Sequence, residues 1–566
     1  MDKFKQKVLD ALKKELKGVN VGIVLEVPPN PEMGDYAFPC FILSKELKKD
    51  PKQIAEDLAK KINLNKHLKK VEVKGPYLNF FVNKEVLAKE VLPAIEKEKD
   101  DYGKSKEGKK KQIMVEFCSP NTNKPLHLGH IRNLMLGESV SKVLEAAGNK
   151  VIRSNLVNDR GVHICKSMYA YKKWGKNKKP NKKSDHFVGD YYVLFAKKAK
   201  ESEKYDKDVK NMLKKWEEGD GATIGLWKKM NKWALDGFEE TYKRLGIKFD
   251  KYYYESDIWS YGRNIIMEGL KKKIFTKDET EAVLVELEKY GLPNKVLLRS
   301  DQTTVYMTQD LYLAHLKFED YNIGKSIYVV ASEQDLHFKQ LFKILELMKF
   351  KDYKKCYHLS YGLVHLPEGR MKSREGKVVD ADDLVDEMVK LAKKEIENRH
   401  KNIDKEELAK RAEQIGIGAL RFFMLRVDHQ RDMTYNPEES ISFEGETGPY
   451  VQYAHARCCS MLKKSPIKEI TSVDFGLLKH PKEISIINLL GTFPELVKDA
   501  ASHYKPAMII RYLLDLAKSF SEFYENCPVI QEDKNLLKAR LLVVDCVRQV
   551  LKNGLNLLGI EAPELM

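Results

Sequence analysis

Two histidines close together mark the stretch of this 566-residue chain that is best suited to phosphate chemistry. Residues 112–133, QIMVEFCSPNTNKPLHLGHIRN, predict a short apolar strand, a turn, and a helix that begins around His127, Gly129 and His130. Nucleotide phosphates bind at such strand ends and helix N-termini in open α/β sheets. Transfer of AMP requires hydrogen-bond donors directed at the charge that builds on the phosphates, and the two histidines and the helix dipole would supply them. Gly129 would let an adenine ring lie against the backbone.

Two other interpretations of His127 and His130 stay open. The histidines could lie on the surface of a helix, or they could bind a metal ion together. The sequence offers no obvious third ligand nearby, whereas a zinc site usually has at least three protein ligands. The prediction is therefore a nucleotide site without a metal ion held by the protein.

Strand and helix signals alternate on both sides of this stretch. Strand signals are found at 151–159, 296–311, 326–335 and 357–364. Their alternation with helical segments favours an α/β fold with a Rossmann-like, doubly wound parallel sheet. Between about 172 and 293 the chain is basic, helical and rich in tryptophan, which is typical of an insertion within this domain.

The two ends of the chain differ from this middle part. Residues 1–83 alternate helix and strand signals, including a strand signal at 21–27, and the lysine-rich segment 96–112 is polar enough to be a linker. The last part is helical, with apolar residues at helical spacing on two faces: Ile509, Leu513, Leu516 and Phe520, and Leu537, Leu541, Val544, Val547 and Leu551. We therefore predict three domains: a small α/β domain over 1–108, a catalytic domain over 109–385 with an insertion at about 172–293, and an all-α bundle over 386–566.

The composition limits the partners and the compartment. The chain holds 100 Lys and Arg against 83 Asp and Glu, a net charge of +17, which indicates a polyanionic partner, although a charged surface of a heat-adapted protein would look similar. No apolar run approaches the length of a membrane span, and the N-terminus is an amphipathic charged helix. The eight cysteines form no CxxC pair, so we expect reduced thiols and a cytoplasmic protein without a membrane partner.

Four segments stand in a recognisable order: SPNTNKPLHLGHIRN, ASEQDLHFKQ, GRMKSREGKVV and SFEGETGPYVQYAHAR. Together they resemble the class I aminoacyl-tRNA synthetases, specifically the arginyl-tRNA synthetase family, over nearly the whole chain. The resemblance implies that L-arginine is activated with ATP and Mg²⁺ to arginyl-adenylate. It also implies that the arginyl group then passes to the 3′-terminal adenosine of tRNA(Arg), at its 2′-hydroxyl. We expect the protein to act as a monomer.

The second class I signature, KMSKS, aligns with residues 370–374 and places Ser373 where the class has its second lysine. The resemblance implies that Lys124 stands in for it, since a flexible ammonium group needs only to reach the phosphates and can start from either side. By itself, GRMKSREGK would be a solvated basic loop. The expected catalytic residues are Lys124, His127, His130 and Lys372, and the expected ATP site is His127, Gly129, His130, Met371, Lys372 and Ser373.

Selection of arginine requires carboxylates in a partly desolvated pocket, because a carboxylate accepts two hydrogen bonds from a planar guanidinium group. The resemblance assigns Glu116, Asn121, Tyr306, Asp310 and Gln334 to this pocket. Without it, Tyr306 is better interpreted as core packing and Asp310 as a helix cap. Spacing leaves open which carboxylate meets the guanidinium group and which the α-ammonium group.

The expected tRNA contacts come from both ends of the chain. In the segment GPYLNFFV, Tyr77 would stack on a base and Asn79 would read a base edge, unless Tyr77 is simply a strand aromatic. Tyr450 and Arg457 are the candidates in the helical part, with Gln452, Tyr453 and His455 beside them, and a helix that packs the bundle would explain most of these equally well. Asn158 and His163 follow the second strand of the sheet, where the family's loop borders the substrate site, and structural hydrogen bonding is an equal alternative.

Two rival functions belong to other classes. A small-molecule nucleotidylyltransferase would share the histidine pair but would need neither the helical bundle nor the basic insertion. A tRNA-binding protein without catalytic activity would share the charged surface and tolerate loss of His127 and His130.

Overall fold

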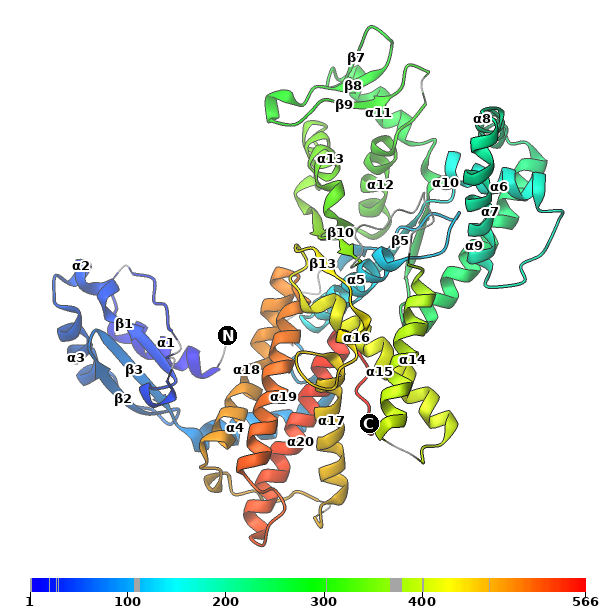
Figure 1. Cartoon of the computed structure of the whole chain (residues 1–566). Helices are drawn as coiled ribbons and strands as arrows, with labels where there is room; N and C mark the ends of the chain where they lie inside the picture. Colours follow the sequence, from blue (N-terminus) through cyan, green and yellow to red (C-terminus); the bar gives the residue numbers. More distant parts are fainter. Residues whose placement is uncertain are drawn as a thin grey trace.

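A computed structural model describes residues 3–19, 21–26, 28, 30–105, 112–301, 303–366, 379–399, 402–467 and 469–566. At its N-terminus an antiparallel sheet in the order β1-β3-β2 packs against helices and encloses its own apolar core (Figure 1). The expected strand at 21–27 is wrong for the residues described there, since only Glu26 makes a bridge, to Ala37. The elements are α1 (Lys3–Glu15), β1 (Tyr36–Pro39), α2 (Ser44–Leu47), α3 (Pro51–Lys61), β2 (Leu68–Lys74) and β3 (Tyr77–Val82).

The centre of the molecule is a five-stranded parallel sheet in the order β11-β10-β4-β5-β6. Side chains on a strand alternate between the two faces, and here Ile113 and Val115 enter one core while Met114 enters another. Chain order reverses between the neighbours β4 and β10, and this is where ligand crevices form in such sheets. The predicted doubly wound fold is confirmed. The strands are β4 (Gln112–Glu116), β5 (Lys150–Val157), β6 (Lys251–Tyr254), β10 (Lys325–Ala331) and β11 (Cys356–Tyr361).

Three helices share apolar cores with this sheet. They are α5 (Leu128–Ala146), α12 (Tyr306–Tyr321) and α13 (Asp335–Leu347). Residues of α5 share a core with Ile113 and Val115, whereas α12 and α13 share the core of Met114. The expected strand at 296–311 is only partly correct. Its first residues form β9 (Lys295–Leu298), and α12 begins at Tyr306.

The predicted insertion at about 172–293 needs correction, because β6 lies inside that range and pairs with β5 in the central sheet. The described residues before β6 form helices, and those after it include a small antiparallel sheet in the order β7-β8-β9. The insertion therefore divides into a helical part and a part that includes this small sheet. Its elements are α6 (Val162–Trp174), α7 (Ser184–Lys198), α8 (Lys204–Glu217), α9 (Gly221–Arg244), α10 (Glu255–Ile258), α11 (Gly262–Lys271), β7 (Thr276–Lys277) and β8 (Val283–Val285).

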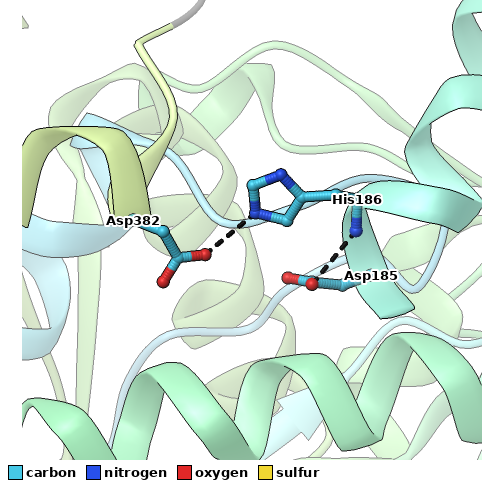
Figure 2. Close-up of side chains that lie close together, drawn as sticks. All are labelled: Asp185, His186 and Asp382. Carbon is cyan, nitrogen blue, oxygen red and sulfur yellow. Dashed lines mark hydrogen bonds and ion pairs between the residues drawn. The ribbon is translucent and has the colours of Figure 1, made fainter. Parts of the chain in front are cut away.

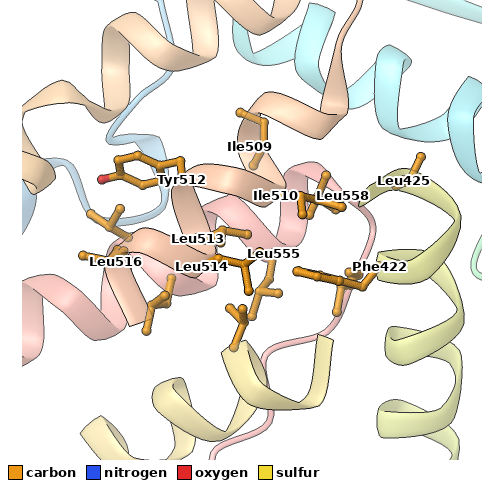
Figure 3. Packing of buried hydrophobic residues seen from close by; sticks show 14 of the residues in the cluster. Phe422, Leu425, Ile509, Ile510, Tyr512, Leu513, Leu514, Leu516, Leu555 and Leu558 are labelled. Atoms are coloured by element: carbon orange, nitrogen blue, oxygen red, sulfur yellow. The ribbon is translucent and has the colours of Figure 1, made fainter. Parts of the chain in front are cut away.

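The C-terminal region is a bundle of long helices, and both apolar faces predicted for it are buried. Figure 3 shows Leu513 of α19 beside Leu555 of α20. The same core includes residues of α4 (Lys84–Glu98) and α5, so the bundle is continuous with the catalytic sheet. The helices are α14 (Ala381–Arg399), α15 (Lys405–Arg426), α16 (Pro437–Ser440), α17 (Gly448–Lys464), α18 (Pro481–His503), α19 (Pro506–Asn526) and α20 (Lys534–Leu557), and β12 (Val364–His365) pairs with β13 (Met433–Thr434).

All eight cysteines are free thiols, as expected. Within the described ranges, every helix is too short or too polar to cross a membrane. The boundary expected near residue 108 lies outside the described residues, and the one expected at 385/386 falls inside α14.

Candidate active site

The turn that follows β4 has an unusual backbone. Cys118 and Ser119 have positive φ angles of 77° and 51°, a left-handed conformation that costs energy for residues with a Cβ atom. Asparagine side chains hold this turn: Asn133 accepts the Cys118 N–H, Asn155 accepts the Ser119 N–H at 3.2 Å, and Asn158 donates to the Ser119 carbonyl at 3.1 Å. These bonds fix the strained backbone, and Asn158 therefore has the structural hydrogen bonding considered as an alternative.

The two histidines cap the helix that begins after this turn. His127 Nδ1 accepts the backbone N–H of Gly129 at 3.2 Å, and His130 Nδ1 accepts that of His127 at 3.1 Å. Each Nδ1 is an acceptor, so in the neutral ring the proton resides on Nε2. The capping bonds therefore determine the tautomer and leave each ring with an Nε2–H donor.

Both histidines are held in the neutral form. Burial lowers the pKa of His127 to about 4, with a further contribution from the nearby Lys124 ammonium group. Burial also lowers the pKa of His130 well below its usual value, helped by His127 and Lys124. Burial lowers the pKa of Lys124 as well, and among the described residues no carboxylate lies within ion-pair distance of this lysine. The helix N-terminus thus combines two neutral donors with one desolvated amine.

A cavity of about 520 Å³ opens between the ends of β4 and β10, at the reversal of strand order. This volume suits a nucleotide-sized ligand. Gln334 reaches the cavity from the short 3₁₀ helix Ser332–Gln334, and Glu333 is the only carboxylate among the described lining residues. The lining residues predicted from the sequence are Asn121, His127, Gly129, His130 and Gln334.

The other predicted arginine-site residues lie outside that lining. Asp310 is in the second turn of α12, and one of its oxygens lies 2.6 Å from His337 Nε2 of α13. Glu116 ends β4 and is buried, with a carboxylate oxygen 2.7 Å from Lys317 Nζ of α12. Asp310 raises the pKa of Glu116, which places the two carboxylates within electrostatic range of each other. Both carboxylates therefore have partners within the protein.

Tyr306 is the first residue of α12 and is 64% exposed, which rules out the core-packing interpretation. Partial burial of its phenol group is the largest cause of its raised pKa, and Glu255, Arg160 and Asp310 also act on it. Glu255 was not predicted from the sequence: it is buried, and burial raises its pKa to about 7. Its sequence context, YYYES, gave the only signal, a carboxylate directly after an aromatic strand.

Met371, Lys372 and Ser373 lie outside the described residues. The described residues that come before and after this segment lie beside the cavity or beside His127. His365 lines the cavity, and Val379 accepts the Leu128 N–H at 3.1 Å. Leu126 in turn accepts the Ala381 N–H at 3.0 Å, so the start of α14 is tied to the residues that flank His127.

Three parts of the chain are similar to described protein families. Residues 91–436 match the family described as tRNA synthetases class I (R), catalytic domain. This chain belongs to the arginyl-tRNA synthetases. Residues 2–82 match the arginyl tRNA synthetase N terminal domain, and residues 451–566 match the DALR anticodon binding domain.

Named relatives agree over the full length of this synthetase. The arginine–tRNA ligase of Treponema denticola is 46% identical over 96% of this chain and 95% of that protein. The arginine–tRNA ligase of Borreliella burgdorferi is 41% identical over 97% of this chain and 96% of that protein. The structure of the Thermus thermophilus arginyl-tRNA synthetase has a TM-score of 0.84 at 27% identity, covering 99% of this chain and all of that one. The resemblance read from the sequence is confirmed.

The residues predicted to contact tRNA differ in exposure. Tyr77 is half-buried beside the exposed Phe41, whereas Asn79 is only 4% exposed, so the interpretation of Asn79 as a base reader is wrong for this conformation. Tyr450 packs partly against the core, and the guanidinium group of Arg457 lies 3.9 Å from the ring centroid of Tyr524.

The other residues considered at the two proposed tRNA and substrate regions also differ in exposure. Gln452 and His455 are buried and hydrogen-bonded to backbone carbonyls, which agrees with the packing interpretation. Tyr453 is 40% exposed. His163 is exposed, with Nδ1 3.2 Å from the Tyr192 hydroxyl.

A polar cluster joins the insertion to the start of α14. Asp382 accepts hydrogen bonds from His186 Nε2 at 2.9 Å and Lys183 Nζ at 2.8 Å, and Asp185 lies beside them (Figure 2). Burial alone would raise the pKa of Asp382, but the bonds from His186 and Lys183 lower it to about 2. The Lys183 ammonium group, 3.0 Å from Asp185, already provides the positive charge, so the cluster is a structural ion-pair network.

Proposed function

We propose that this synthetase condenses L-arginine with ATP to arginyl-adenylate and then transfers the arginyl group to the 3′-terminal adenosine of tRNA(Arg). The observation that carries this proposal is the meeting of two different sites at one sheet edge. Neutral histidine donors stand at the N-terminus of α5, and a pair of carboxylates stands where β4 meets α12. The first suits phosphates and the second suits a guanidinium group.

On the ATP side, the Nε2–H groups of His127 and His130 would donate to the phosphates. Gly129 would admit the adenine, and Lys124, with Lys372, would neutralise the charge that develops on the leaving pyrophosphate. Met371 and Ser373 complete the proposed ATP site. Lys124 is supported in this role by its position beside both histidines. Binding and orientation would then account for most of the rate, with no covalent intermediate on the protein.

We treat Mg²⁺ as part of the substrate. The described residues around the cavity do not form a magnesium cage, since Glu333 is their only carboxylate and Mg²⁺ usually binds to phosphates, one or two carboxylates and water. The ion would arrive bound to ATP and would screen the phosphate charges during the attack by the arginine carboxylate.

On the arginine side, Glu116 and Asp310 would bind the positive groups of the amino acid. Asn121, Tyr306 and Gln334 would fix its orientation from the two rims of the crevice. The support is their position: Asn121 and Gln334 line the cavity, and Tyr306 and Asp310 share the first turns of α12. Glu255 lies within electrostatic range of Asp310 and would add to the negative potential in its ionised form.

The division into domains is part of the proposal. The N-terminal α/β domain, within 1–108, would contact tRNA through Tyr77. The catalytic domain, within 109–385, would hold the adenylate. The helical bundle, within 386–566, would bind the anticodon stem and loop with Arg457 and Tyr450. We further propose a monomer in the cytoplasm, because one chain carries all of the proposed site residues.

A charging assay tests this function. Purified protein, tRNA, ATP and Mg²⁺ are incubated with arginine, lysine or another amino acid, with tRNA present from the start because the family's activation step is expected to depend on it. Arginyl-tRNA should form and the other amino acids should not be attached. Charging of another amino acid in preference to arginine would overturn the specificity.

One double variant and one further assay separate the rival functions. Replacement of both histidines, His127→Asn with His130→Asn, should abolish charging, whereas a tRNA-binding protein without catalytic activity would show no charging in the wild type and would keep its tRNA binding in the variant. Deletion after residue 440 is unsuitable as a test for a small-molecule nucleotidylyltransferase, because α17, α19 and α20 share a core with α5. Release of pyrophosphate without tRNA or amino acid dependence would support that rival instead.

A further inference from the structure

A buried lysine that no step above requires lies beside Glu116, one of the proposed arginine ligands. Lys317 is fully buried, and its ammonium group lies 2.7 Å from a carboxylate oxygen of Glu116, which is itself only 5% exposed. The same ammonium group lies 3.9 Å from the ring centroid of Tyr328, the residue of β10 that pairs with Glu116 across the sheet. Residues of β4, α12 and β10 therefore meet at the buried Lys317 ammonium group.

Lys317 and the proposed substrate ligand Asp310 belong to the same face of the same helix. They are seven residues apart on α12, which is two turns. The Asp310 side chain is partly exposed beside His337, whereas Lys317 is fully buried beside Glu116. Glu116 is within electrostatic range of both, since Lys317 lowers its pKa and Asp310 raises it.

Lys317 and Asp310 are the charged groups that act on Glu116. Two carboxylates and one ammonium group leave one net negative charge, which one guanidinium group would balance. Without Lys317, the buried Glu116 carboxylate would have no compensating cation, and burial together with the nearby Asp310 would drive Glu116 towards its protonated form. A protonated Glu116 would present a donor to a guanidinium group that has only donors.

Stability alone does not account for such a pair. Buried ion pairs often stabilise a fold no more than apolar residues of the same size would, because both charges lose their hydration. The ion pair of Lys317 with Glu116, and the place of this lysine two turns from Asp310 on α12, point instead to a role in binding.

We propose that Lys317 is a positioning residue for arginine: it holds one oxygen of Glu116, keeps that carboxylate ionised, and directs its second oxygen to the substrate. This inference rests on the proposed function. The groups that face Glu116 are Lys317 and Asp310 on α12, Tyr328 on β10 and Tyr253 on β6, and of these Lys317 alone provides a compensating cation.

The test compares Lys317→Met with the wild type in charging assays between pH 6 and pH 9. At pH 7 the KM for arginine should rise about 30-fold, the scale for loss of one partner of a buried charge pair. The KM for ATP should stay within a factor of two or so of the wild type. The arginine defect should shrink as pH rises, because Glu116 regains its charge above its raised pKa. Lys325→Met, a lysine of β10 that bonds to the Tyr504 hydroxyl, is the matched control and should leave both constants unchanged.

A structural role would give other results. Equal losses for arginine and ATP, or an arginine defect that does not depend on pH, would overturn the inference. If Lys317→Met does not fold, as judged by circular dichroism, the comparison moves to Glu116→Gln with and without Lys317→Met. The double variant replaces the ion pair by two neutral groups, and its arginine KM should match that of Glu116→Gln. A much larger loss in the double variant would show that Lys317 acts other than through Glu116.

The design separates this inference from the proposed function. If the wild type fails to charge tRNA with arginine, the function is wrong before any variant is compared. If the wild type charges arginine normally and the variants do not behave as described, only the role of Lys317 is wrong.

Discussion

The N-termini of α5 and α12 hold the two halves of the proposed site and have opposite electrostatics. At α5, burial keeps His127 and His130 neutral, and each Nδ1 is engaged in a capping bond. At α12, Asp310 and its neighbour Glu116 are carboxylates, each with a basic partner at 2.6 to 2.7 Å. The α5 side therefore offers neutral hydrogen-bond donors, and the α12 side offers carboxylate acceptors that each have a basic partner.

This difference follows from what each proposed ligand brings. ATP carries several negative charges together with Mg²⁺, so neutral donors at a helix N-terminus can orient the phosphates, while Lys124 and Lys372 would act on the charge that develops on the pyrophosphate. Arginine brings one guanidinium group, and its selection over other amino acids depends on buried acceptors that only this group satisfies. Variants that remove charge should therefore damage the arginine side most.

The largest effect is expected for Asp310→Asn. The neutral amide presents one acceptor and an extra donor to the guanidinium group and also loses the charged partner of His337, so kcat/KM for arginine should fall on the order of 10⁴-fold. The KM for ATP should change little. Steady-state charging assays in which either arginine or ATP is varied measure these two quantities. A decrease of less than tenfold in kcat/KM for arginine would show that Asp310 is not part of the arginine site.

Lys124→Ala should follow. This amine lies near both histidines and is desolvated, and by analogy with loss of one oxyanion donor its removal should lower the rate of arginine activation about 10² to 10³-fold. Rapid-quench measurement of adenylate formation with tRNA present gives the rate. Lys89→Ala, an exposed lysine of α4 paired with Glu85, is the control and should be unaffected. Near-wild-type activation in Lys124→Ala would mean that another group supplies the missing signature lysine.

A smaller effect is expected for Gly129→Ala. A Cβ atom there would lie 3.1 Å from Cε1 of the His127 ring, which must then move from its capping position. We expect the KM for ATP to rise about 10- to 100-fold, since small misplacements of binding groups have effects of this size, while the KM for arginine stays the same. Gly225→Ala, at an exposed position of α9 with open space around it, should have no effect. A rise in both constants would argue that the damage extends beyond the histidines.

The sequence predicted the α5 side better than the α12 side, for physical reasons. A strand, a turn and a helix start at 112–130 are local features, so their chemistry is visible in a short stretch. Lys317 and Glu116 are about 200 positions apart in the sequence. The spacing of residues along a helix does not indicate that one of its lysines is buried beside a carboxylate from a distant strand. β6 was missed because a four-residue strand inside a helical insertion gives too little alternation to stand out. Asn79 was misassigned because its burial depends on how the small N-terminal domain closes around β3.

The smallest expected effect is a difference in titration among three histidines, and it can be measured without any change in activity. His127 and His130 have lowered pKa values, whereas the pKa of His186 is raised, chiefly by its hydrogen bond to Asp382. In protein labelled with carbon-13 at histidine Cε1, the ring signals of His127 and His130 should therefore stay at neutral positions from pH 8 down to about pH 5.5, while His186 titrates above 6.5. Single His→Asn variants assign the signals. Titration of His127 or His130 near pH 6.5 would contradict the neutral donor pair.

The lowered pKa values of His127 and His130 and the raised pKa of His186 make the free energy of unfolding depend on pH in opposite directions. The unfolded chain takes up protons at His127 and His130 below about pH 6.5, but the folded chain does not, so their contribution to stability is present at neutral pH and is lost as pH falls towards 4. For His186 the contribution is complete below pH 6.5 and is lost as pH rises through its raised pKa. His186→Asn should therefore destabilise the protein more at pH 6 than at pH 8, and thermal unfolding at the two values measures the difference. An equal loss at both would show that His186 is not protonated beside Asp382, and the cluster at α14 would then share the neutral character of the α5 pair.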